Sequence, residues 1–225
     1  MSADSRQNEV ATAARRAMLR RGIGATLREI AREGGFTTGL VSHYFPDKRA
    51  VVVGAFAAAS EDFIGMVRES LAAATDSNSL LSALIEAAVP STAERQAEWR
   101  LWAEMWAYAG RDREFAAVIE PTDALWVREI EQVLFRLIDD GILRSDVDAA
   151  SQAVILGRLV DGLGIRAWLS GDWDQARSVL LVHLRSLGLS ARLASALEPK
   201  PKASALEPKP RAAHRSQTRA GKISS

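Results

Sequence analysis

The sequence predicts an all-α protein, and three features of its 225 residues support that fold class. Apolar residues recur at helical spacing almost everywhere up to about residue 189. No segment shows the strict alternation, or the richness in β-branched residues and tyrosine, that is typical of strands. Glycine and proline divide the pattern into segments of ordinary helix length. A chain of this length has room for one or two domains, each with a core of its own.

The first helix is expected over about residues 8–21, where an apolar face runs from Val10 to Met18. Gly22 and Gly24 follow, and glycine readily adopts the backbone conformations that end a helix. The first helix is therefore expected to be amphipathic, with one face in a core.

The second and third helices are expected to be short, with a glycine turn between them. Residues 26–29, TLRE, match a capping box, in which a hydroxyl and a carboxylate three residues apart satisfy free amide groups at a helix start. Gly34 and Gly35 then allow a sharp reversal of the chain. Thr37 is placed to cap a third helix over Thr38–Tyr44.

A long fourth helix is expected from about Pro46 and Asp47 to residue 74, where TDSNS interrupts the pattern. Ser91-Thr92-Ala93-Glu94 offers a second capping box. Proline and glycine separate the remaining helices, which are expected near 79–89, 92–110, 113–119, 122–140, 147–169 and 173–188.

The two ends of the chain are basic and its middle is acidic. Residues 1–59 carry nine Lys/Arg against five Asp/Glu, residues 60–189 carry 12 against 21, and residues 190–225 carry eight against two. The last segment contains ASALEPKP twice, and its prolines and charges predict a disordered basic tail over 190–225. Basic ends indicate an anionic partner, and chance clustering of solvated charges is the alternative.

The composition also excludes several function classes. The absence of cysteine removes disulfides, thiolate metal sites and cysteine nucleophiles together. The N-terminal MSADSRQNEV has no apolar core behind a basic start, and no stretch reaches about 18 uncharged apolar residues. We therefore expect a cytoplasmic protein without a membrane partner, a metal or another cofactor.

The short third helix carries groups suited to DNA. A helix, a glycine turn and a second short helix form a helix-turn-helix, whose second helix enters the major groove. Gly39 leaves room for close approach, and Lys48 offers an ammonium to a phosphate. The alternative is an ordinary helical hairpin in which Thr37 is only a cap. The DNA-contacting residues predicted from this pattern are Thr37, Thr38, Gly39, Leu40, Ser42, His43, Tyr44 and Lys48.

These residues resemble the DNA-binding domain of the TetR family, through TLREIA at 26–31 and GFTTGLVSHYFPDK at 35–48. The match covers about 45 residues, and the string SHYF at 42–45 is similar to the choline-responsive BetI branch, whereas many other relatives carry tyrosine at Ser42. The resemblance implies a homodimer on a palindromic operator, with recognition helices about 34–36 Å apart. It implies phosphate contacts for Thr26, Thr37, Tyr44 and Lys48, and groove-facing positions for Thr38, Gly39, Leu40, Ser42 and His43.

All six tryptophans lie between residues 99 and 173, and three of them share one face of a helix. Indole rings supply apolar area and attract cations, including quaternary ammonium groups. Asp161 lies in an apolar stretch where burial would make it a counter-charge, and a helix-surface or dimer contact is its alternative. The resemblance implies an inducer pocket among these helices, and core packing is the alternative for each tryptophan. The predicted effector-binding residues are Trp99, Trp102, Trp106, Trp126 and Asp161.

The helices near 122–140 and 147–169 have the wide apolar faces and small residues of a self-complementary interface. The resemblance implies that these helices pair with those of a second copy in a four-helix bundle. Internal core packing is the alternative. The predicted dimer residues are Ile130, Val133, Leu134, Leu137, Ala153, Gly157, Val160 and Gly164.

The sequence therefore predicts a ligand-responsive transcriptional regulator, most simply a repressor, that a small cationic or aromatic effector releases from its operator. Its expected parts are a DNA-binding domain at 1–50, an effector-binding and dimerisation domain at 51–189 and the tail at 190–225. No enzyme is predicted, because the three histidines are far apart and no metal, triad or dinucleotide motif is present. The competing hypothesis is a helical interaction module whose basic tail binds nucleic acid without sequence preference.

Overall fold

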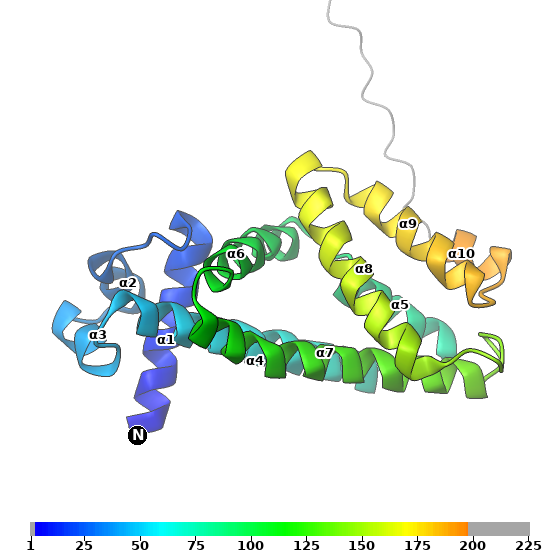
Figure 1. Cartoon of the computed structure of the whole chain (residues 1–225), viewed down its shortest axis with the longest axis horizontal. Helices are drawn as coiled ribbons and strands as arrows, with labels where there is room; N and C mark the ends of the chain where they lie inside the picture. The colour runs from blue at the N-terminus through cyan, green and yellow to red at the C-terminus, as the bar shows by residue number, and fades with distance from the viewer. Residues whose placement is uncertain (1–2, 198–225) are drawn as a thin grey trace, which may run out of the picture.

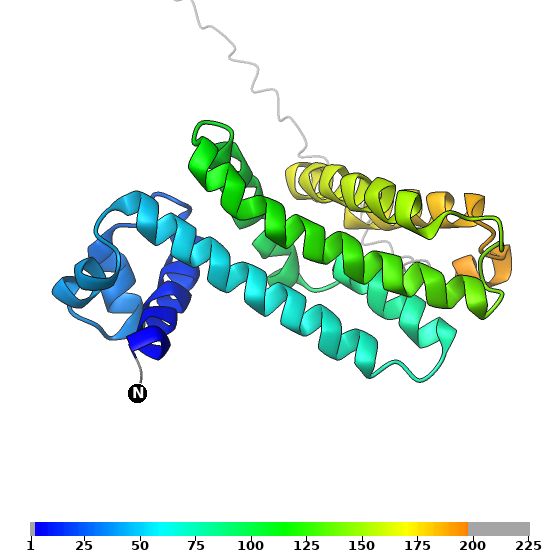
Figure 2. The ribbon, with the colours of Figure 1, turned by 60° about the horizontal axis from the view of Figure 1, so that its bottom comes forward.

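The computed structural model describes residues 3–197, and within that range the chain is helical without strands. Figures 1 and 2 show α1, α2 and α3 grouped at one end of the molecule, while α4 and α7 run side by side from this head into a larger body. The helices are α1 (Ala3–Arg21), α2 (Leu27–Gly34), α3 (Thr38–Tyr44), α4 (Lys48–Ala72), α5 (Ser77–Ala88), α6 (Ala93–Ala109), α7 (Arg113–Asp139), α8 (Ala149–Ser170), α9 (Trp173–Ser186) and α10 (Ala191–Leu197).

Local capping signals set the boundaries of α2 and α3 and the start of α4 as predicted, whereas α1 begins at Ala3, before the expected start near residue 8. Thr26 and Glu29 form the capping box at the start of α2, and Gly35 ends that helix in the left-handed region at φ 67°. Thr37 accepts from the Leu40 amide at 3.2 Å to cap α3. Asp47 caps α4 in the same way. Side-chain oxygens at these positions satisfy amides that a helix start leaves without partners.

Two predictions from local signals in the body are wrong. Pro121 does not divide 113–140, because α7 is continuous through it. The ring removes one amide donor, and Pro121 is exposed, so water can satisfy the carbonyl that is left free. The second capping box does not form, since Ser91 binds Glu86 and Thr92 alone caps α6.

The predicted tail begins with a helix instead of disordered chain. Residues 191–197 form α10, whose Ala194 is fully buried. Leu193 and Leu197 pack against the body core, and this apolar contact stabilises a segment that its composition alone would leave unfolded. The rest of the predicted tail, 198–225, lies outside the described residues.

Two hydrophobic cores share α4, so the head core extends beyond residue 50. Val51 and Val52 lie in the head core, whereas Ile64 and Val67 lie in the body core. With a mean hydropathy of 1.6, α4 is long and apolar enough to span a membrane by length and composition. Its division between two cores gives this apolar composition a structural reason within the fold.

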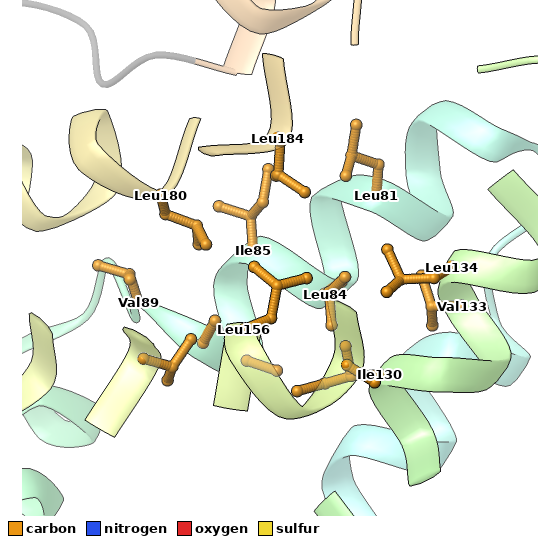
Figure 3. Packing of buried hydrophobic residues seen from close by; sticks show 14 of the residues in the cluster. Leu81, Leu84, Ile85, Val89, Ile130, Val133, Leu134, Leu156, Leu180 and Leu184 are labelled. Atoms are coloured by element: carbon orange, nitrogen blue, oxygen red, sulfur yellow. The ribbon is translucent and has the colours of Figure 1, made fainter. Parts of the chain in front are cut away.

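The eight residues predicted for the dimer interface are buried within a single chain, which corrects that prediction. Figure 3 shows Ile130 and Leu134 in one cluster with Leu84 of α5, Leu156 of α8 and Leu184 of α9, so this apolar stripe of α7 is covered within the chain, most extensively by α8. The buried set is Ile130, Val133, Leu134, Leu137, Ala153, Gly157, Val160 and Gly164. A different set of large apolar residues is exposed, namely Phe135, Val154, Ile155, Trp168, Leu169, Val179 and Val182.

Candidate functional site

Helix α3 is anchored by one face and open on the other. Val41 and Phe45 are buried against the head core, while Leu40 and Tyr44 are half-buried. The His43 ring meets the Tyr44 ring edge-on at 5.0 Å. The exposed residues are Thr37, Thr38, Gly39, Ser42 and His43, which all belong to the predicted DNA-contacting set. The arrangement leaves a continuous polar surface for a partner outside the chain.

The two threonines that the family resemblance places on phosphates differ in their hydrogen bonding. The Thr26 hydroxyl accepts from the Glu29 amide and donates to the Glu29 carboxylate at 2.9 Å, so its single proton is engaged. The Thr37 hydroxyl accepts from Leu40. Its proton has no acceptor among the residues that the structure describes, so Thr37 is better placed than Thr26 to donate to a phosphate.

Lys48 ties the start of α4 to the loop before α2. Its ammonium donates to the Ala25 carbonyl oxygen, and burial of that ammonium lowers the pKa of Lys48. Because an ammonium carries three donors, this bond leaves two for a phosphate.

Gly39 has open space where a side chain would project. A Cβ built at Gly39 meets only the Thr37 hydroxyl, at 3.9 Å. A methyl group would therefore fit in the DNA-free chain, so packing within the head does not require glycine at this position. The room at Gly39 is available to a partner.

The predicted effector residues come together in one cavity of about 440 Å³ in the body. Trp99 and Trp126 are buried, and Trp102 and Trp106 are half-buried. Trp106 lies 6.0 Å from the Trp99 ring and 6.4 Å from the Trp102 ring, between centroids. Phe63 joins the wall at 5.4 Å from Trp126. These aromatic residues come from α4, α6 and α7, and Asp161 of α8 also lines the cavity.

The charges in the cavity wall are predominantly negative, with four carboxylates against two arginines. Arg158 pairs with both carboxylate oxygens of Asp123, and also with Asp161 at 3.4 Å. Burial raises the pKa of Asp161 to about 6, and the nearby Arg158 only partly offsets this effect. Asp161 is ionised at neutral pH, and a bound cation would favour that form.

Sequence reasoning missed the polar residues of this wall, although a signal for some of them was present. Arg95 and Glu98 precede Trp102 by seven and four residues, which places them on the indole-bearing face of α6. Asp123 and Arg158 come from α7 and α8, and their pairing depends on how these two helices pack. Only the residues on α6 could have been found from spacing.

Helix α6 contacts the cavity and the head at once. Glu98 lines the cavity, and one of its oxygens accepts from the Arg15 guanidinium of α1 at 2.7 Å. Glu104 accepts from the Ile23 amide, in the loop between α1 and α2, at 2.6 Å. Leu101 and Met105 belong to the head core. A displacement of α6 by a ligand would therefore act directly on the head.

Within the part of the chain that the structure describes, no group of three or more histidine, aspartate or glutamate side chains could hold a metal ion. His183 of α9 and Gln152 of α8 lie 3.2 Å apart, between the ring Nε2 and the amide oxygen.

Two family models match the chain at the two parts described above. Residues 11–55 match the model of bacterial regulatory proteins of the tetR family. Residues 77–189 match the model of the C-terminal part of BetI-type transcriptional repressors. The first match covers most of α1, all of α2 and α3 and the start of α4. The second covers all residues that line the cavity except Phe56 and Phe63 of α4.

Curated relatives and solved structures agree with these models. The regulator PksA of Bacillus subtilis is 25% identical over 189 residues, which cover 82% of this chain and 90% of PksA. BetI of Cronobacter sakazakii is 27% identical over 170 residues, covering 72% of this chain and 79% of that protein. A regulator from Saccharomonospora viridis, solved in complex with choline, matches with a TM-score of 0.68 at 24% identity, over 82% of this chain and 97% of that one. This chain belongs to the TetR family of transcriptional regulators, near its BetI branch.

Proposed function

We propose that this regulator is a cytoplasmic repressor that binds a palindromic operator as a homodimer and is released by a small organic cation. The observation that carries the proposal is the double role of α6, which lines an aromatic, acidic cavity and contacts the head through Glu98 and Glu104. A ligand site and a DNA-reading helix joined by one rigid element are what a ligand-controlled repressor needs.

The chemistry of the cavity favours an organic cation as effector. Four indole rings, whose π-systems attract positive charge, line the cavity, and its wall holds twice as many carboxylates as arginines. Asp161 is mostly buried and supplies a counter-charge within the wall. The choline complex of the Saccharomonospora viridis regulator supports the same ligand chemistry in a protein of this fold.

The proposed route of release runs through the carboxylate of Glu98. This group pairs with Arg15 and also faces the cavity, so a bound cation competes with Arg15 for it. Arg15 keeps its second partner, Asp62 of α4, and the loss of the first one loosens α1 from α6. The coupling needs only a few kcal/mol of differential affinity between two orientations of the head.

The exposed apolar residues of α8 and α9 support a dimer. Val154 and Ile155 of α8, with Val179 and Val182 of α9, are each more than two-fifths exposed. Large exposed apolar residues on neighbouring helices mark an interaction surface. A second copy that packs the same face against this one forms a closed, two-fold symmetric four-helix contact.

Selection from a random DNA library tests the DNA-binding part of the proposal. The purified full chain is incubated with labelled random duplexes at physiological salt, and the retained DNA is sequenced. We expect enrichment of one palindrome whose half-sites are about one helical turn apart. Retention without a consensus contradicts the proposal and favours the basic tail as a nonspecific DNA-binding segment.

Deletion of the C-terminal tail distinguishes these two outcomes, and the fold determines at which residue the deletion starts. Residues 191–197 pack on the body, so the deletion starts at residue 198. A repressor that reads DNA with α3 keeps its operator preference without 198–225. A tail-dependent binder loses nearly all affinity after the same deletion.

A further inference from the structure

Arg95 is the one arginine of the cavity wall that has no carboxylate partner within the described chain. It lies in the first turn of α6, and its Nε atom is buried without a hydrogen-bond partner. Its Nη1 atom contacts only the Met66 sulfur, a weak acceptor, at 2.7 Å. Arg158, the other arginine of the wall, binds both oxygens of Asp123. The cavity therefore presents one satisfied and one unsatisfied guanidinium.

A guanidinium in this state has a strong preference for an oxyanion. Its planar fork matches the two oxygens of a carboxylate, and a buried donor left unbonded is costly. The position at the start of α6 adds to this preference, because the amino end of a helix carries partial positive charge. Water and chloride would satisfy Arg95 less well than a carboxylate that a ligand holds in place.

Along α6, the cavity wall changes from the positively charged Arg95 to a series of indole rings. Arg95, Trp99, Trp102 and Trp106 follow one another at i, i+4, i+7 and i+11, and all four line the cavity. At about 1.5 Å per residue, Arg95 lies about 6 Å along the axis from Trp99 and about 10 Å from Trp102. A ligand that reaches both would carry its negative and positive groups a few bonds apart.

We propose that the natural effector is a zwitterion, with an alkylated ammonium among the indoles and a carboxylate on Arg95. This inference rests on the proposed effector function of the same cavity and adds the anionic half of the ligand. The net negative wall and Asp161 select the cation, and the unsatisfied Arg95 selects the oxyanion. A cation without a carboxylate fills only part of this site.

Tryptophan fluorescence and calorimetry of the full chain test the inference with four probes. Trimethylglycine and γ-trimethylaminobutyrate carry both charges at two separations, whereas choline and tetramethylammonium carry only the cation. We expect at least one zwitterion to bind about 10-fold to 100-fold more tightly than either cation, the size of a charge-assisted pair. Equal affinity of zwitterions and cations overturns the inference and leaves the cationic effector in place. Absence of binding by all four probes overturns both.

Arg95→Gln identifies the group responsible. The variant should lose the preference for the zwitterion by at least about tenfold and keep its affinity for tetramethylammonium within about twofold. Arg128→Gln, an exposed position of α7 outside the cavity wall, makes the same charge change and should alter neither affinity. Equal losses for zwitterion and cation in Arg95→Gln would mean that Arg95 only shapes the cavity. Thermal unfolding of both variants shows whether they are folded.

Discussion

Helices α3 and α6 differ in how completely their surfaces are used within the chain. The seven residues of α3 bury Val41 and leave a polar face exposed. The 17 residues of α6 bury Leu101 and Met105 in the head and direct three indoles into the cavity. A helix with a free polar face acts on a partner outside the chain, whereas a helix occupied on two faces transmits between parts of it. The comparison predicts that substitutions on α3 change DNA affinity alone and substitutions around α6 change ligand response.

The largest effect is expected at Gly164, where α8 touches the wall of the cavity. A Cβ there would lie 2.4 Å from three ring atoms of Trp99. Gly164→Ala should displace Trp99, reduce effector affinity by about 100-fold and lower the free energy of unfolding by about 1–3 kcal/mol. In Gly162→Ala, on the same helix, the new methyl group meets open space. This variant should keep its effector affinity, and its free energy of unfolding should rise by about 0.5–1 kcal/mol. Equal ligand affinity in the two variants would contradict the packing of Trp99 on Gly164.

The Gly39→Ala variant tests whether α3 contacts DNA. The new methyl group meets no close atom in the free chain, so it should not lower the thermal unfolding temperature. It should weaken operator binding by about 10-fold to 100-fold if, as we propose, the DNA occupies this space. Gly65→Ala adds a methyl group to open space on α4 and should leave operator affinity unchanged. If Gly39→Ala bound the operator as tightly as the wild type, Gly39 would not lie against the DNA.

Glu98→Gln tests transmission through α6. Loss of the carboxylate removes the group for which Arg15 and the cation compete. The ratio of operator affinities without and with effector should fall about fivefold, as measured by fluorescence anisotropy of labelled operator. Asp62→Asn removes the other partner of Arg15, outside the cavity wall, and should preserve this ratio. If both variants respond like the wild type, the coupling takes another path.

The pH dependence of effector binding tests the charge that α8 contributes to the cavity wall. The pKa of Asp161 is raised to about 6, so its carboxylate is fully charged at pH 8 and about one-tenth charged at pH 5. A permanently charged cation should therefore bind up to about tenfold more weakly at pH 5. The Asp161→Asn variant should bind the cation weakly at both pH 8 and pH 5, and its affinity for the cation should be the same at the two pH values. If the affinity of Asp161→Asn for the cation fell between pH 8 and pH 5 as much as that of the wild type, the titrating group would be another residue.

Burial of Asp161 also links folding to pH. Its pKa in the folded state lies above the ordinary aspartate value of 3.8, so folding is most favoured where the carboxyl is protonated in both states. This contribution is lost as the pH rises from about 4 to 6. In the absence of ligand, Asp161→Asn should therefore be at least as stable as the wild type at pH 7.

The same two helices show how far the sequence predicts the structure. Capping residues such as Thr26, Thr37 and Asp47 act over three positions, so the boundaries of the head could be predicted from local pattern. The indole stripe of α6 was predictable from its spacing, and the structure brings all of its members into the cavity with Trp126 and Asp161. Whether these residues bind an effector remains a prediction.

Features that depend on packing between distant helices could not be predicted. The apolar stripe of α7 that contains Ile130 is covered by α5 and α8, and periodicity shows that a face is buried but not what buries it. The short α10 depends on tertiary contacts in the same way. The link between Glu98 and Arg15 joins residues 83 positions apart.

The measurement that tests the central claim most directly is a titration of the operator complex with ligand. A labelled duplex carrying the selected palindrome is bound to the full chain, and anisotropy is followed as the effector is added at physiological salt. We expect release of the DNA at the same ligand concentrations that change tryptophan fluorescence. Saturation of the cavity with no loss of operator binding would contradict the proposal that α6 couples the cavity to the DNA-reading head.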